Sequence, residues 1–249
     1  MKKSSPLQTT TFSLRIMAMI FMLCDHLWAT IIHGNEWLTC IGRLTFPIFA
    51  FLIVEGYFHT KNLKKYVLRL LIFAVISEIP FNLVTGNSLI YPMHQNVLWT
   101  FLIAIFLIFL NEKARQKEKW WLTLLVAVAT IALGFALGLI TFTDYFHGGV
   151  YMVLTFYFFR GRRWWNFLGQ AALMWYINFE IIGGYSYVLP LFGKEFYFPQ
   201  QGFALLALIP IWLYRGKQGY HHKAMQYAFY AFYPAHLLIL WLIGTLLNA

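Results

Sequence analysis

The chain has 249 residues, of which 60% are hydrophobic, 20% aromatic and only 11% charged. A soluble domain carries about 25% charged residues, so this composition excludes an ordinary soluble protein and indicates a polytopic membrane protein. The formal net charge of +10 is compatible with nucleic-acid binding, but the distribution of the charges described below argues against it. The two cysteines, Cys24 and Cys40, are too few for a disulfide framework and lack metal-ligand spacing.

Nine apolar segments are candidates for membrane-spanning helices, which need about 20 mainly apolar residues each. In chain order they are Phe12–Ile32, Trp37–Phe58, Leu63–Val84, Val97–Leu110, Trp120–Thr141, Tyr145–Phe159, Trp164–Ile182, Phe198–Tyr214 and Met225–Leu247. The fourth and sixth segments are shorter than the others. The sequence therefore predicts an all-α fold, a polytopic integral membrane helical bundle of about nine transmembrane helices, formed by a single domain over residues 1–249.

The basic residues fall on one side of this nine-helix arrangement. Of the 19 Lys and Arg, 17 precede the first segment, open it, or join or flank alternate pairs of segments: Lys2, Lys3, Arg15, Lys61, Lys64, Lys65, Arg69, Lys113, Arg115, Lys117, Lys119, Arg160, Arg162, Arg163, Arg215, Lys217 and Lys223. Lys194 lies on the other side, and Arg43 lies inside the second segment. The positive-inside rule then places the N-terminus in the cytoplasm and Ala249 outside, in a multi-pass protein of a bacterial inner or plasma membrane.

Titratable residues interrupt several of these segments at a similar depth. At about 1.5 Å per residue, Asp25 and His26 lie roughly 20 Å from the cytoplasmic end of the first segment, and Arg43 lies roughly 9 Å from the outer end of the second. Glu78 is in the outer half of the third segment, and His236 is near the middle of the ninth. An ionisable residue at membrane depth costs at least ~2.5 kcal/mol, so this convergence indicates a functional site.

Asp25 and His26 are neighbours on a helix, so their side chains point about 100° apart and do not form a dyad with each other. We expect one of them to face Arg43, as an ion pair between the first two segments, and the other to face a cavity. His26 and His236 are the two histidines at a depth suited to general base catalysis at neutral pH. No Gly-x-Ser-x-Gly or His-x-x-x-His motif is present, so we expect direct proton transfer without a covalent enzyme intermediate.

Structural roles stay open for several of these groups. The Asp25–Arg43 pair could serve only to join two helices. Glu78 precedes a proline by two residues and could mark a helix break whose freed backbone groups are capped locally. His236 follows a proline by two residues and could bond a carbonyl left free by a kink. Glu55 could pair with a lysine of the following loop. Three further residues lie at the expected outer mouth or rim: His94, Asp144 and His147.

Three stretches of the sequence resemble one known family. They are "LRIMAMIFMLCDH", "IGRLTFPIFAFLIVEGYFHTKNLKKYVLRLLIFAVISEIPFN" and, near the end, "YAFYPAHLLIL". Together they resemble the TraX family, whose founding member acetylates the amino terminus of pilin. The most specific matching positions are an Asp-His pair and a Gly-Arg…Phe-Pro motif: Asp25, His26, Gly42, Arg43, Phe46 and Pro47. The resemblance is close over the first three segments and good over the last one.

The resemblance implies a single transmembrane acyltransferase-like domain that moves an acetyl group from cytosolic acetyl-CoA to an amine or hydroxyl of an exported or membrane acceptor. The acceptor is a peptide, a lipid or a glycan, membrane lipids are partners, and neither a metal nor a nucleic acid is expected. The expected catalytic residues are His26, Asp25, Arg43, His236 and Glu78. Acetyl-CoA phosphates are expected on the basic loops, at Lys61, Lys65, Arg160, Arg162 and Arg163.

A more distant similarity, to membrane-embedded acyl-CoA-dependent acyltransferases with a histidine in an early span, favours His26 as the general base. Two other functions fit the same residues. Buried charges also mark the ion paths of proton-coupled transporters, although no inverted repeat is evident and nine segments do not divide into two equal halves. A membrane scaffold without enzymatic activity would use the Asp25–Arg43 pair only to hold helices together. Binding of acetyl-CoA distinguishes the enzyme from both alternatives.

Overall fold

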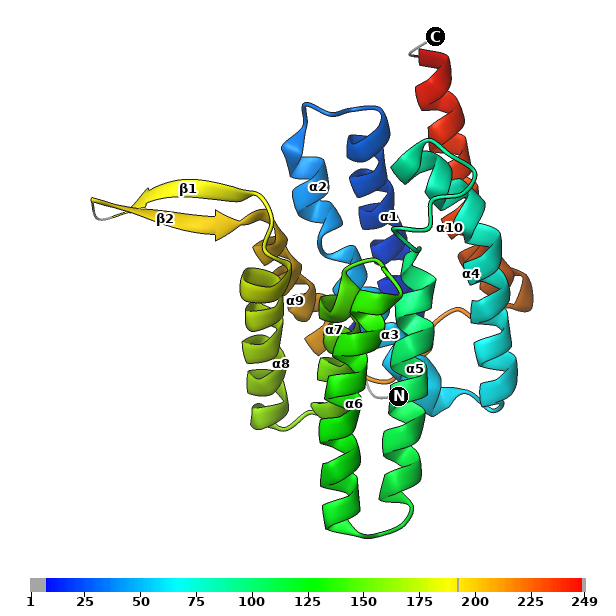
Figure 1. The fold of residues 1–249 in the computed structure, drawn as a ribbon, viewed down its shortest axis with the longest axis vertical. Coiled ribbons are helices and arrows are strands. Elements are labelled where there is room, and N and C mark those ends of the chain that lie inside the picture. Colours follow the sequence, from blue (N-terminus) through cyan, green and yellow to red (C-terminus); the bar gives the residue numbers. More distant parts are fainter. Residues whose placement is uncertain (1–7, 192, 248–249) are drawn as a thin grey trace, which may run out of the picture.

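A computed structural model of the chain describes residues 8–191 and 193–247. The described part consists of helices and one β-hairpin (Figure 1). Three terminal residues that the sequence analysis assigned to a side of the membrane, Lys2, Lys3 and Ala249, lie outside the described residues.

The helices stand roughly parallel and alternate in direction along the chain, which produces an elongated bundle (Figure 1). In chain order the elements are α1 (Thr11–Thr30), α2 (Glu36–Gly42), α3 (Thr45–His59), α4 (Leu63–Gly86), α5 (Val97–Arg115), α6 (Trp120–Ile140), α7 (Phe146–Phe158), α8 (Trp164–Tyr176), the π-helix η1 (Ile177–Ile182), β1 (Ser186–Leu191), β2 (Lys194–Pro199), the 3-10 helix η2 (Gln200–Ala207), α9 (Leu208–Trp212) and α10 (Lys223–Leu247).

Six helical stretches are long and apolar enough to cross a membrane: 11–30, 36–59, 63–86, 97–115, 120–140 and 224–247. All nine predicted segments contain helix, but nine spanning helices are not supported. The sixth segment forms the 13-residue α7, the seventh forms α8 followed by η1, and the eighth forms η2 and α9. The helix α7 is apolar because it is buried in the protein and not because it faces lipid. Its residues Val150, Met152 and Val153 are fully buried against neighbouring helices.

The helical fold is confirmed, but it contains one hairpin that the sequence does not predict. The strands Ser186–Leu191 and Lys194–Pro199 are antiparallel, and Val188 pairs with Tyr197 and Leu189 with Phe196. The sequence predicts a loop here, followed by an eighth helix from Phe198. The turn between the strands contains Gly193 with a φ of 73°, a conformation that glycine adopts without strain.

Short polar residues determine where several helices begin. The Thr10 hydroxyl accepts from the backbone N–H of Ser13 at the start of α1, and the Asn62 side chain accepts from Lys65 N–H at the start of α4. These contacts satisfy N–H groups that have no partner within the helix. Pro80 and Pro234 lie inside α4 and α10, which continue past them.

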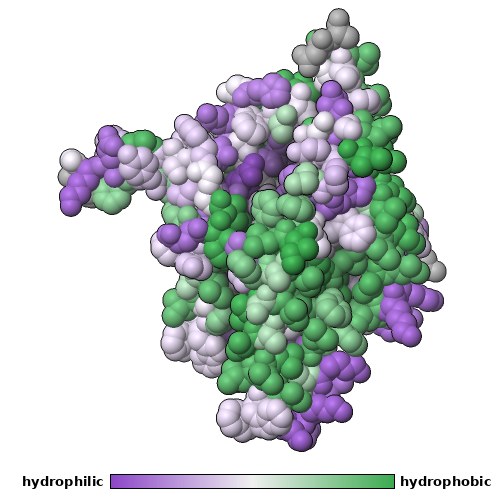
Figure 2. Space-filling model, viewed as in Figure 1, coloured by the Kyte–Doolittle hydropathy of each residue, from purple (hydrophilic) through white to green (hydrophobic). Residues whose placement is uncertain are grey.

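The two ends of the bundle differ in charge. The connections α3–α4, α5–α6, α7–α8 and α9–α10 lie at one end (Figure 1), which we call the basic end because most of the Lys and Arg are there. The connections α1–α2, α4–α5 and α6–α7 and the hairpin lie toward the opposite end (Figure 1). Figure 2 shows apolar residues over the middle of the bundle and a hollow lined by hydrophilic residues near the opposite end, close to α2.

Candidate functional site

Two histidines from opposite ends of the chain meet between α1 and α10. The Nδ1 atom of His26 lies 2.6 Å from the Nε2 atom of His236, and the two rings stack with centroids 4.8 Å apart. His236 is buried, whereas His26 is partly exposed. The ring of Tyr233 adjoins both histidines, at centroid distances of 6.5 Å and 5.9 Å. The helices α1 and α10 therefore bring together residues that are 210 positions apart.

The contacts of this pair assign the positions of its protons. The Nδ1 atom of His236 lies 2.7 Å from the carbonyl oxygen of Phe232, which only accepts hydrogen bonds, so Nδ1 carries the proton. In a neutral His236 the Nε2 atom is then an acceptor, and His26 must donate from its Nδ1. A neutral His26 with its proton on Nδ1 presents an unprotonated Nε2, which is the atom that a general base uses.

The expected ion pair between the first two predicted segments is confirmed. The Nη2 atom of Arg43 lies 2.8 Å from Oδ1 of Asp25, and both side chains are 20% exposed. The Thr39 hydroxyl donates to the same carboxylate oxygen at 2.7 Å and accepts from Arg43 Nη2 at 2.6 Å. The close approach of α1 and α2 depends on Gly42, because a Cβ there would lie within 2.6 Å of Asp25 Oδ1.

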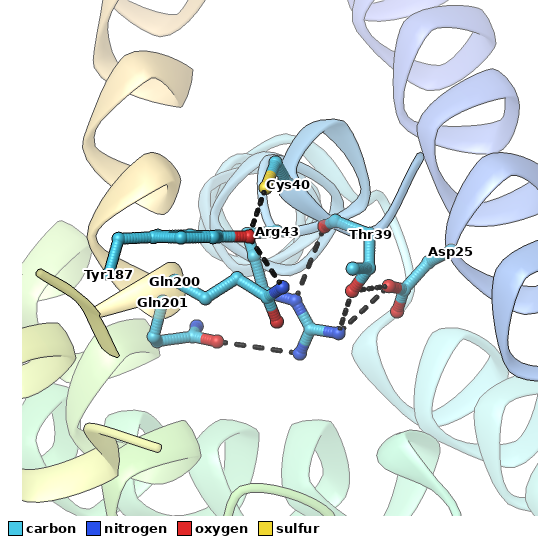
Figure 3. A network of polar contacts seen from close by, with 7 residues as sticks. All are labelled: Asp25, Thr39, Cys40, Arg43, Tyr187, Gln200 and Gln201. Atoms are coloured by element: carbon cyan, nitrogen blue, oxygen red, sulfur yellow. Dashed lines mark hydrogen bonds and ion pairs between the residues drawn. The ribbon is translucent and has the colours of Figure 1, made fainter. Parts of the chain in front are cut away.

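Arg43 continues this polar network toward η1, η2 and the hairpin (Figure 3). Its Nη1 atom lies 3.5 Å from Oε1 of Gln201, whose amide nitrogen donates to the buried Asn178 at 3.0 Å. A second set of contacts close to Arg43 links the hairpin to α2 and η2. The hydroxyl of Tyr187 lies 3.2 Å from the Cys40 sulfur and accepts a hydrogen bond from the Gln200 side chain at 3.1 Å (Figure 3). The π-helical turn of η1 carries Asn178, and such turns are frequent at functional sites.

The connections between α4 and α5 and between α6 and α7 border the same network. His94 donates to Asp144 Oδ1 at 3.3 Å, and this hydrogen bond raises the pKa of His94 above its ordinary value because the carboxylate favours the charged imidazolium. Asp144 and Tyr145 also interact electrostatically with Arg43. Arg43 is thus the common partner of residues from four parts of the chain.

Glu78 and His147, by contrast, do not join this network. The Glu78 carboxylate accepts from the backbone and the side-chain amide of Asn96 and from the indole of Trp99 at 2.7 Å. Asn96 is the N-cap of α5, so Glu78 supports a helix start, and it acts on His94 and Tyr233 only through longer-range electrostatics. The expected helix break at Pro80 does not occur. His147 packs its ring against Phe135 of α6.

An apolar cavity extends from the basic end toward the histidine pair. Its volume is about 110 Å³, and it lies between α1, α3, α4, α5 and α10. Arg15 lines it at the start of α1, while Met22 and Tyr233 line it one turn or less before His26 and His236. We call this space the histidine cavity. Most of its lining is apolar, with Arg15 toward the basic end.

Two arginines beside the histidine cavity have no carboxylate partner. Arg15 lies over the ring of Phe229 at 5.4 Å, and the buried Nε of Arg69 has no hydrogen-bond acceptor among the described residues. Both guanidinium groups interact electrostatically with the hydroxyl of Tyr66, which lines the cavity. Within residues 8–191 and 193–247 neither arginine forms an ion pair. These two charges are therefore available to an anionic ligand.

A second cavity, of about 370 Å³, lies at the basic end between α3, α7 and α9, and we call it the arginine cavity. Arg160 donates to Glu55 at 2.8 Å within it, so the expected pairing of Glu55 with a lysine of the following loop is wrong. Arg162 donates to the carbonyl oxygens of Tyr214 and Trp212 at the end of α9. The two predicted phosphate-binding arginines in this cavity already have protein partners.

The other three predicted phosphate-binding residues lie outside both cavities. The guanidinium of Arg163 is 4.9 Å from the ring centre of Trp165, and Lys61 and Lys65 are exposed around the start of α4. From the sequence, Tyr233 was missed, and Arg15 and Arg69 were interpreted only as topology signals. The signal that could have identified the arginines is their place inside apolar helices, where an unpaired charge is costly.

Comparison with known proteins identifies the family of this chain. The family model described as TraX protein matches residues 11–244. The chain is 28% identical over 256 residues to the probable fimbrial assembly protein FimC, serogroup H1, of Dichelobacter nodosus, covering 93% of this chain and 94% of that protein. No solved structure is significantly similar. Both histidines, the Asp25–Arg43 pair and the histidine cavity fall within the matched residues, and the chain is a multi-pass membrane protein that belongs to the TraX family.

Proposed function

We propose that this protein is a membrane-embedded acetyltransferase that moves an acetyl group from cytosolic acetyl-CoA to an amine or hydroxyl of an exported or membrane acceptor. One observation carries the proposal: the His26–His236 pair leaves Nε2 of His26 unprotonated, and Met22 and Tyr233, about one helical turn before these histidines, line a cavity that starts at the basic end. A base at the junction of a donor cavity and a polar network is the arrangement that acyl transfer requires.

In the proposed reaction, His26 Nε2 accepts the proton of the acceptor amine or hydroxyl as that group attacks the thioester carbonyl carbon. The carbon–sulfur bond then breaks, and the departing thiolate takes the proton from His26, which leaves free CoA and the acetylated acceptor. Arg43 stabilises the negative charge that develops on the carbonyl oxygen, since its charge acts on the His26 ring. Asp25 holds Arg43 in place.

Acetyl-CoA enters from the basic end in this proposal. Arg15 and Arg69 bind its phosphates, and the exposed Lys61 and Lys65 add long-range attraction. The pantetheine arm and the acetyl group occupy the histidine cavity. The engaged side chains of Arg160, Arg162 and Arg163 support helix packing in this scheme.

The proposed orientation places the basic end in the cytoplasm and the hairpin end outside, as the distribution of Lys and Arg favours. The acceptor then approaches through the hydrophilic hollow of Figure 2 or from the bilayer. The name of the similar fimbrial assembly protein supports a polypeptide destined for a surface fibre as the acceptor. Glycans and lipids are the competing acceptors.

The function is tested with radiolabelled acetyl-CoA and membranes from cells that produce the native protein or the His26→Ala variant. We expect the purified native protein to bind acetyl-CoA and its membranes to gain a labelled product that the variant lacks. Binding without any acetyl-CoA-dependent product, or no binding at all, would overturn the proposal. Mass spectrometry of the labelled fraction distinguishes peptide, glycan and lipid acceptors.

The orientation has a separate test in intact cells. Single cysteines at Glu118, in the α5–α6 turn, and at Lys194, in the hairpin turn, are treated with a membrane-impermeant thiol reagent in a background without Cys24 and Cys40. We expect labelling at position 194 and none at 118 until the cells are opened. The reverse pattern would show that the protein has the opposite orientation in the membrane, and it would contradict delivery of acetyl-CoA from the cytoplasm.

A further inference from the structure

The hairpin β1–β2 exposes apolar side chains on both of its faces. Leu189 and Phe196 pair across the strands on one face, and Val188 and Tyr197 pair on the other. These four side chains and that of Tyr185 are between 42% and 65% exposed. A two-stranded hairpin in water is marginally stable, and one that is apolar on both faces has no water-facing side. The hairpin therefore requires an apolar or amphipathic surrounding.

Figure 1 shows that the hairpin projects sideways, across the direction of the helices, beyond the end of α8 and η1. Within the described residues, the contacts of its two strands are mainly with each other. Its base is anchored, because Tyr187 contacts Cys40 of α2 and Gln200 of η2. The free part is the outer half of both strands.

The helical segment that leads from the basic end to the hairpin is about as long as a membrane is thick. The helix α8 with η1, Trp164–Ile182, is about 28 Å long at ~1.5 Å per residue, close to the ~30 Å hydrocarbon core of a bilayer. Trp164 and Trp165 are exposed where this segment starts, and Tyr185 follows directly after it. Tyrosine and tryptophan concentrate at both membrane–water interfaces.

Other connections at the hairpin end carry exposed apolar side chains as well. Trp37 begins α2, Ile90 lies between α4 and α5, and Phe142 lies between α6 and α7; they are 57%, 79% and 37% exposed. Such residues on three separate connections are unfavourable in open water but suit the boundary between headgroups and acyl chains. The hairpin continues this ring of residues.

We propose that the hairpin lies in the membrane–water interface at the end opposite the basic end, with its strands parallel to the bilayer surface. Both apolar faces then contact the headgroup and upper acyl-chain region, while headgroups and water satisfy the unpaired strand edges. Lys194 and Glu195, at the turn, reach the headgroups. The bilayer thereby holds Tyr187 against α2, next to the Arg43 network. This inference does not depend on acetyl transfer.

The test is spin labelling of the full chain in phospholipid nanodiscs, in a background without Cys24 and Cys40. Labels at positions 196 and 197 report on opposite faces of β2. A label at Leu125, exposed in α6, serves as the lipid reference, and one at Glu118, in the α5–α6 turn, as the aqueous reference. Power saturation with oxygen and with a water-soluble nickel chelate gives the depth of each label.

We expect both hairpin labels to show an oxygen-to-nickel accessibility ratio several-fold above that at 118 and below that at 125. Ratios equal to that at 118 at both positions would place the hairpin in water and overturn the proposal, leaving a protein partner to cover its faces. A high ratio at one position only would contradict immersion of both faces. If the label at 196 prevents folding, its cross-strand partner at 189 replaces it.

Discussion

The histidine cavity and the arginine cavity differ in size, in charge and in what lies near their ends. The arginine cavity is the larger, about 370 Å³ against about 110 Å³, and it contains three arginines, but Glu55 and backbone carbonyls engage two of them. The histidine cavity is mainly apolar, and it extends from Arg15 to within about one helical turn of the histidine pair. Volume and positive charge therefore locate a basic surface, whereas nearness to the histidine pair distinguishes the histidine cavity as the candidate donor site.

The largest expected effect concerns the ion pair beyond the histidine cavity. Removing one partner of a fully buried pair typically costs ~3–5 kcal/mol. Each side chain of this pair is 20% exposed, so Asp25→Ala and Arg43→Ala should each lower stability by less than that but still clearly. The double variant should lose less than the sum of the two, because both changes remove the same contact. Unfolding of the purified variants in mixed micelles measures this, and strict additivity would argue against the contact. Gly42→Ala, which pushes a Cβ against Asp25, should mimic the single variants.

His236 is expected to act through His26. Loss of its Nε2 acceptor frees the His26 ring, so His236→Ala should slow acetyl transfer by about 10²-fold, the cost of misplacing a catalytic group. His236→Gln retains an oxygen that can accept from His26 Nδ1 and should recover part of the rate, whereas His236→Leu should not. Equal rates for the Gln and Leu variants would show that His236 has only a packing role.

Binding of acetyl-CoA distinguishes the two cavities directly. A hydrogen bond to a charged group contributes about 1.5–3 kcal/mol, so Arg15→Ala or Arg69→Ala should weaken binding about 10- to 100-fold. Arg162→Ala is the matched control, since its guanidinium already binds the end of α9. Calorimetry on purified protein measures all three. A large loss for Arg162→Ala with none for Arg15→Ala would move the donor site to the arginine cavity.

The smallest effect concerns pH and the His94–Asp144 pair at the hairpin end. The folded protein raises the pKa of His94 above its ordinary value of 6.5. The contribution of the protonated His94 to the free energy of unfolding is therefore complete below about pH 6.5 and is lost as the pH rises through the raised pKa. The pair is partly exposed, so it contributes less than about 1 kcal/mol. Thermal unfolding across this window should show a pH slope that Asp144→Asn removes. An unchanged slope would exclude this pair as its source.

The sequence predicts local features of this protein better than distant ones. The Asp25–Arg43 pair is predictable because consecutive antiparallel helices place their outer ends together. The His26–His236 contact is not, since pairing of the first helix with the last depends on the whole order of packing. The hairpin was missed because its strands are short and glycines precede and join them, a pattern typical of a loop.

The phosphate-binding residues show a related limit. Arg160, Arg162 and Arg163 form the densest cluster in the sequence, but the fold places a partner beside each one. Arg15 and Arg69 are isolated in the sequence, and only the packing of α1 and α4 brings both near Tyr66, which lines the histidine cavity. Helix composition also does not distinguish burial in protein from exposure to lipid, which explains why α7 was counted as a spanning helix.

A single-turnover experiment tests the central assignment, that His26 is the general base at the end of the donor cavity. Purified His26→Ala protein is loaded with radiolabelled acetyl-CoA, and transfer to acceptor-containing membranes is followed with time. We predict a rate 10²–10⁴-fold below that of the native protein, with acetyl-CoA affinity retained, because the histidine lies beyond Arg15 and Arg69. Near-native transfer by His26→Ala, together with none by a folded His236→Ala, would exchange the two roles and contradict the assignment.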